Sequence, residues 1–114
     1  MAASTTFIND MLNTAFTGTI TIGLFSTGLP STTGVEASGG GYARQTITVG
    51  TAASKVISSA GDVTFSNLLT SQTYVAYGVY KAGVLIDENT LSSQFTADVS
   101  NNELKIVYSF RLNA

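Results

Sequence analysis

The sequence predicts a mainly β fold: an antiparallel, jelly-roll-like β-sandwich with a short N-terminal helix. Helical spacing of apolar residues is confined to the segment before Gly18, and beyond it apolar residues recur at every second position in seven or eight short runs separated by turn residues. At 114 residues the chain is long enough to bury a core without disulfides or a metal, so we expect residues 1–114 to form a single domain.

The helix is expected within residues 1–18, in the stretch STTFINDMLNTAF. Ser4, Thr5 or Thr6 can cap its N-terminus, and Gly18 is placed to end it. About three turns would bring one apolar stripe to the core. The residues of that stripe are Phe7, Ile8, Met11, Leu12, Ala15 and Phe16.

Three longer runs alternate as strands do. In residues 19–25 the inward set is Ile20, Ile22 and Leu24. In residues 42–49 one face carries Ala43, Gln45, Ile47 and Val49, and the other carries Tyr42, Arg44, Thr46 and Thr48. In residues 103–112 the inward set is Leu104, Ile106, Tyr108, Phe110 and Leu112, with Glu103, Lys105, Ser109 and Arg111 outside. A helix cannot present this period.

Shorter strands are expected at 54–58, 62–68, 73–80, 83–88 and 93–99. Turn residues separate them at 60–61 and 81–83. Asn101-Asn102 can adopt positive φ, which predicts a tight hairpin that joins the last two strands. The order of strands in the sheets does not follow from the sequence.

One long connection, residues 26–41, is rich in Gly, Ser and Thr and ends in three glycines before a strand. Connections of this length are usually functional or disordered, and we expect it to be a contact arm. The glycines would let the backbone approach its own sheet or a neighbouring subunit. Arg44 either pairs with Glu36 to pin the loop or anchors an interface. The candidate interface residues are Glu36, Gly39, Gly40, Gly41, Tyr42 and Arg44.

Composition argues against several classes of function. The net charge of −2 without a basic cluster disfavours nucleic-acid binding. With no His and no Cys, the usual triads and imidazole or thiolate metal sites cannot form, so we expect no catalytic residue, metal or cofactor. The adjacent Asp87 and Glu88 should point to opposite faces at a solvated strand end. The N-terminus has no signal-peptide pattern and no stretch could span a membrane.

Three tyrosines at 74, 77 and 80 raise the alternative of a carbohydrate-stacking platform. Strand alternation turns Tyr77 away from Tyr74 and Tyr80, so at most two share a face. Ordinary strand aromatics explain them better.

Residues 19–83 resemble a family of small tailed-bacteriophage proteins described as tail fibre or virion structural proteins. The resemblance centres on a Gly-x-Glu step followed by Gly-Gly-x-Tyr-Ala-Arg-Gln. The family's later Gly-Leu-Trp-Asp-like strand is replaced here by Tyr77-Gly78-Val79-Tyr80-Lys81. The matching residues are Gly34, Glu36, Gly40, Gly41, Tyr42, Ala43, Arg44 and Gln45.

The resemblance implies a non-enzymatic virion protein, made in the host cytoplasm, with no catalytic residues to carry over. A compact domain without a shaft favours a capsid cement or decoration protein, with itself and the major capsid protein as partners. The alternative is a tail fibre or baseplate adaptor involved in host attachment. A carbohydrate-binding module ranks third and an enzyme last.

Overall fold

The computed structural model describes residues 4–112, which form one helix and eight strands. The mainly β, antiparallel prediction with a short N-terminal helix is confirmed. The elements are α1 (Thr5–Ala15), β1 (Ile20–Phe25), β2 (Gln45–Ile47), β3 (Val56–Ser58), β4 (Val63–Phe65), β5 (Thr73–Lys81), β6 (Val84–Thr96), β7 (Leu104–Ile106) and β8 (Ser109–Arg111).

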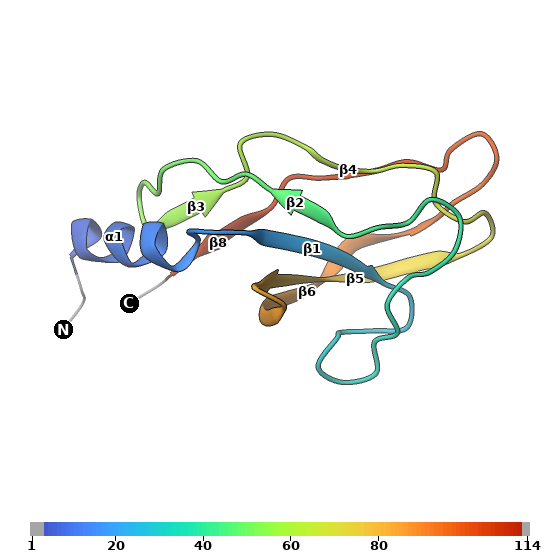
Figure 1. The fold of residues 1–114 in the computed structure, drawn as a ribbon, viewed down its shortest axis with the longest axis horizontal. Coiled ribbons are helices and arrows are strands. Elements are labelled where there is room, and N and C mark those ends of the chain that lie inside the picture. The colour runs from blue at the N-terminus through green and yellow to red at the C-terminus, as the bar shows by residue number, and fades with distance from the viewer. Residues whose placement is uncertain (1–3, 113–114) are drawn as a thin grey trace.

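Helix α1 begins and ends where the sequence predicts. The Ser4 hydroxyl accepts a hydrogen bond from the Phe7 amide at 3.1 Å, and Gly18 has the positive φ of a C-terminal stop, +81°. The helix lies at one end of the molecule (Figure 1), where it contacts β3. Its buried stripe is narrower than predicted. Ile8, Leu12 and Phe16 are buried, whereas Phe7 and Met11, which were predicted to belong to the same stripe, are exposed.

A four-stranded sheet in the order β2-β1-β5-β6 forms one layer. Two ribbons, β3-β8 and β4-β7, form the other layer, on the opposite side of the main core (Figure 1). Ile20, Ile22 and Leu24 of β1 all face this core, as predicted, and each is at most 1% exposed. This arrangement is sandwich-like, while the jelly-roll connectivity stays a prediction, because the ladders form three separate sheets.

The last predicted strand, residues 103–112, is broken into β7 and β8. Its alternation survives, since Tyr108 is buried and Val107 exposed, but β7 pairs with β4 and β8 with β3. Those two partners are themselves separated by the turn at Ala60-Gly61. Ser59 connects the chain to Tyr108 between the two ladders. Its amide donates a hydrogen bond to the Tyr108 carbonyl at 2.7 Å, and its hydroxyl accepts one from the Tyr108 amide at 3.1 Å.

The predicted strands at 83–88 and 93–99 are one long strand, β6, and not two. Its pairing with β5 is irregular: Ala76 opposes Thr90 and Tyr74 opposes Phe95, so four residues of β6 face the single residue Val75. This bulge accommodates the chain without ending the strand. It also rotates Tyr74 into the main core beside Tyr77, so the prediction that Tyr74 and Tyr80 share a face is wrong.

The prediction of a tight hairpin turn at Asn101-Asn102 is wrong, because the turns lie at other residues. The positive φ angles of a primed turn occur at Ala82 (+50°) and Gly83 (+81°), which join β5 to β6. The turn before β7 is closed by Asp98 and Asn101, whose backbones exchange two hydrogen bonds. There the Asp98 carboxylate accepts from the Ser100 and Asn101 amides, so a side chain and not a positive φ shapes the turn.

Candidate functional site

The connection 26–41 folds back over the sheet. The backbone of the returning half of the loop forms hydrogen bonds with the end of β1 and the residue after it. The Ser26 amide donates to Val35 O at 2.9 Å, and the Ala37 amide donates to Leu24 O at 2.8 Å. Phe25 and Glu36 form an antiparallel bridge. The connection is therefore anchored by the same type of bond that builds the sheet.

The first part of this loop, with Leu29 and Pro30, covers the outer face of the four-stranded sheet, whereas Ala37 in its second part is buried in the main core. On the outer face lies a second, smaller core, formed by Phe25, Ala76 and Tyr80. Leu29 of the loop packs against it, together with Leu85 of β6. The sheet is consequently covered on both faces in this region, which explains why five of the six residues of β1 are buried.

Two glycines facing each other across β1 and β5 make room for the loop. Gly23 is the register partner of Gly78. A Cβ on Gly78 would lie 2.8 Å from Pro30 Cγ, and one on Gly23 would lie 2.8 Å from the Tyr42 hydroxyl. Contacts this short are essentially never made by a Cβ atom, so side chains here would displace Pro30 of the loop and the Tyr42 side chain.

The tip of the loop is held by Glu88 of β6, whose carboxylate accepts hydrogen bonds from the Ser31 amide at 2.9 Å and from the Ser31 hydroxyl. Asp87 points to the other face, where it accepts from the Tyr108 hydroxyl at 2.6 Å. The prediction of opposite faces is confirmed. The prediction of a solvated strand end is wrong, because both residues are half-buried within β6 and bind other segments.

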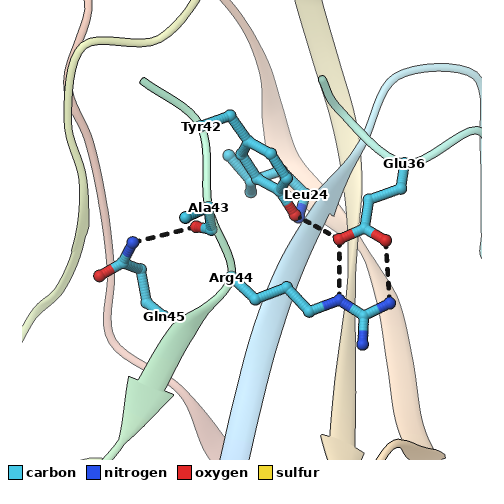
Figure 2. Close-up of polar contacts among 6 residues, drawn as sticks. All are labelled: Leu24, Glu36, Tyr42, Ala43, Arg44 and Gln45. Carbon is cyan, nitrogen blue, oxygen red and sulfur yellow. Dashed lines mark hydrogen bonds and ion pairs between the residues drawn. The ribbon is translucent and has the colours of Figure 1, made fainter. Parts of the chain in front are cut away.

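The base of the loop is held by Glu36, which binds two residues of the glycine-rich motif (Figure 2). Its carboxylate accepts two hydrogen bonds from the Arg44 guanidinium, both at 2.8 Å, and one from the Tyr42 hydroxyl at 2.7 Å. The Tyr42 hydroxyl also accepts a hydrogen bond from the Leu24 amide at 3.1 Å. The guanidinium lies 3.8 Å from the centre of the Tyr80 ring, a cation–π contact.

These contacts shift the pKa values of the three residues. Hydrogen bonds from Arg44 hold the pKa of the Glu36 carboxyl below its usual value, more strongly than partial burial raises it. The same pair raises the pKa of Arg44. Burial, followed by the hydrogen bond to Glu36, raises the pKa of the Tyr42 hydroxyl. At neutral pH the cluster therefore consists of a carboxylate, a guanidinium and a neutral phenol, an arrangement suited to holding segments together.

Replacing Glu36 with glutamine should reduce stability by about 1 kcal/mol at neutral pH, the scale of a partly exposed ion pair. Because the folded pKa lies below the unfolded value near 4.5, the wild-type advantage is present above that pH and disappears as pH falls through the folded pKa. Urea unfolding between about pH 7 and pH 3 would measure it.

A matched control for this experiment is Glu103→Gln. Glu103 lies 3.8 Å from Lys105, and both side chains are about half exposed, so the change should have little effect at either pH. If wild type and Glu36→Gln lose stability in parallel on acidification, the ion pair does not stabilise the fold.

The glycine triplet packs against a neighbouring turn of the same chain. Gly40 has a φ of +57°, and a Cβ there would lie 2.9 Å from both Asn67 O and Leu69 N. The Gly41 amide donates to Asn67 O at 2.7 Å. The sequence left open an approach to its own sheet or to a neighbouring subunit. In the structure the triplet packs on residues 67–69 of the same chain, a segment that follows β4 and is not part of a sheet.

All six candidate interface residues lie around this loop base, and each contacts its own chain. Loop pinning by Arg44 and Glu36, one of the two alternatives, is observed. A role for these residues in an interface with another chain stays a prediction. Tyr42 departs from the predicted alternation: only residues 45–47 form the strand β2, and the Tyr42 ring stacks on Phe65 at 6.1 Å.

Sequence reasoning missed the residues that complete this site from elsewhere in the chain. They are Gly23, Gly78 and Glu88, and the paired glycines were the available signal, since glycine inside a strand often marks close backbone approach. Within residues 4–112, groups of three or more potential metal-binding side chains are absent. The single helix in that range is too short to cross a membrane.

The fold and this site define a mainly β domain in which a long loop is locked onto its own sheet by an ion pair, a tyrosine and close-packed glycines. Compared with protein-family models and with curated proteins, the sequence matches none of them.

Proposed function

We propose that this chain is a non-enzymatic structural protein of a tailed-bacteriophage virion, and within that class a capsid cement or decoration protein. The observation that carries the proposal is that the residues of the resembling motif, within positions 34–45, make their contacts inside the domain. Tyr42 and Arg44 both bind Glu36, and Gly34 and Gly40 pack on backbone atoms. Their polar groups are engaged in contacts within the domain, which suits a rigid building block.

The dimensions and the composition agree with such a role. The domain measures 49 × 27 × 25 Å, and charged residues make up 11% of the sequence. A surface with few charges loses little solvation energy when it is covered by neighbours. A cement protein of this kind would bind itself and the major capsid protein, and each added contact would stabilise the shell.

The experiment compares particles that carry the chain with particles that lack it. If the chain is a cement protein, particles without it should release their genome at a lower temperature, and adding the purified chain should restore the release temperature, because many bound copies add their binding free energies. An unrelated protein of similar size serves as the control for nonspecific protection.

A different result would favour the tail alternative. Particles that hold their genome equally well without the chain, but no longer adsorb to cells, would overturn the cement assignment and identify a tail fibre or baseplate adaptor. Absence of the chain from purified particles, measured by mass spectrometry, would overturn the virion proposal itself.

A further inference from the structure

The tip of the long loop, residues 27–34, is closed on itself. The amides of Thr32 and Gly34 both donate to Leu29 O, at 3.0 and 2.9 Å. A Cβ on Gly34 would lie 2.7 Å from the backbone oxygens of Gly28 and Leu29, so the two ends of the tip touch. Contacts within a loop of this kind hold its shape, as in an Ω-loop. The tip therefore has a shape that its own bonds maintain.

Three consecutive residues attach the tip to the outer face of the sheet. Leu29 packs against the small core beneath the loop. Pro30 lies over Gly78, where a Cβ would be 2.8 Å from the proline Cγ. Ser31 donates its amide, at 2.9 Å, and its hydroxyl to the Glu88 carboxylate. The sheet thus receives, in this order, an apolar side chain, a proline ring and two hydrogen-bond donors.

The surface beneath the tip is held in place by the sheet itself. Its residues are register partners in the ladders of β1, β5 and β6, so backbone pairing positions them independently of the tip. The Arg44 guanidinium, 3.8 Å from the centre of the Tyr80 ring, fixes that ring from the loop base. Recognition sites are usually preformed in this way. We call this surface the outer-sheet site: Phe25 with Ala76, Gly78 with Glu88, and Tyr80 with Leu85.

The base of the loop is anchored by bonds that lie outside the tip. They are the backbone bonds of Ser26 with Val35 and of Ala37 with Leu24, and the contacts of Glu36. Displacing the tip leaves all of them in place. Glycines stand at positions 28 and 34, at both ends of the segment that would move, and glycine accommodates large backbone changes. The outer-sheet site can therefore be uncovered without unfolding the sheet or the loop base.

We propose that the outer-sheet site is a docking site for a turn of another protein that presents an apolar residue, a proline and a hydroxyl residue in succession, and that the loop tip is its internal competitor. The occupant is defined by the segment already seated there, which shows each contact that the site makes. Because the tip is tethered, its effective concentration is in the millimolar range or above, and a partner must displace it. The inference goes beyond the virion proposal and does not depend on it, since the purified chain tests it.

A head-to-tail cyclised peptide with the sequence of residues 26–35 is the probe. Cyclisation matches the structure, in which the Ser26 amide lies 2.9 Å from Val35 O. In the full chain, Leu29→Ser combined with Ser31→Ala should free the site, because both changes lie in the tip. In an NMR titration, the peptide should bind this double variant at least about tenfold more tightly than wild type, whose own tip competes. The shift changes should fall on the outer-sheet site.

Two controls test the chemistry of recognition. A cyclic peptide that carries the same two substitutions should not bind the double variant. Adding Glu88→Gln to the double variant should weaken binding of the original peptide about threefold or more, because the charged acceptor of two hydrogen bonds is lost. Circular dichroism checks folding, and Ser31→Ala alone, at an exposed residue, should show a smaller gain in affinity if the double variant does not fold.

Three results would overturn the docking site. They are no binding of the original peptide to the folded variants, equal affinity of that peptide for wild type and for the folded variants, and equal binding of the original and the substituted peptide.

Discussion

Replacing Tyr108 with alanine is expected to lower the free energy of unfolding by about 3–5 kcal/mol, the usual cost of removing a buried aromatic ring. Tyr108 is 1% exposed. Its ring packs on Phe16 of the helix region at 6.1 Å and edge-to-face on Tyr77 of β5 at 6.0 Å. Its hydroxyl binds Asp87 of β6. One side chain thus joins both layers and the helix region, and urea unfolding would measure its loss.

Two further variants separate the parts of this effect. Tyr108→Phe keeps the ring but leaves the half-buried Asp87 carboxylate without its donor, which should cost about 1–3 kcal/mol. Val107→Ala, at the adjacent residue that is 64% exposed, should change stability by less than about 0.5 kcal/mol. Equal effects of Tyr108→Ala and Val107→Ala would contradict the assignment of Tyr108 to the core.

The second large effect is expected for Gly40→Ala, which should destabilise the fold by about 2–4 kcal/mol. Alanine at this position would have to adopt the left-handed φ of +57°, and its Cβ would meet backbone atoms of Asn67 and Leu69 at 2.9 Å. Backbone atoms cannot rotate out of the way as a side chain can, so the turn at 67–69 or the loop base must move. Thermal unfolding followed by circular dichroism would measure the change.

Gly61→Ala is the matched control for this variant. Gly61 lies in a turn, its φ is outside the left-handed region, and a Cβ there would meet nothing within 4 Å. The change should be neutral, or stabilising by a few tenths of a kcal/mol to about 1 kcal/mol through the unfolded state. If Gly40→Ala is as mild as Gly61→Ala, then the triplet does not depend on close packing.

Local patterns were enough to predict the features that depend on the spacing of side chains along the chain. The capped helix, the inward set of β1 and the alternation of residues 103–112 depend on side-chain period alone, and the structure retains all three. The ion pair of Arg44 with Glu36 was foreseeable, as one of two alternatives, since the residues are close in sequence and the chain has few charges.

The remaining features depend on partners far away in the sequence. The bulge opposite Val75, which rotates Tyr74 inward, follows from the pairing of β5 with β6. The break between β7 and β8 exists because β3 and β4 are separate partners. Glu88 meets Ser31 across 57 positions, and a single sequence contains no signal for such a contact. Packing and not propensity decides these features.

The two separate cores give this small domain two levels of cooperativity. Among residues 4–112, the core beneath the loop contains three buried residues, Phe25, Ala76 and Tyr80, whereas the main core contains seventeen. Lifting the tip of the loop requires loss of the Ser31–Glu88 bonds and the Leu29 contact, and it leaves the main core intact. Amide protons near the loop tip should therefore exchange through a local opening, while those of β1 wait for global unfolding.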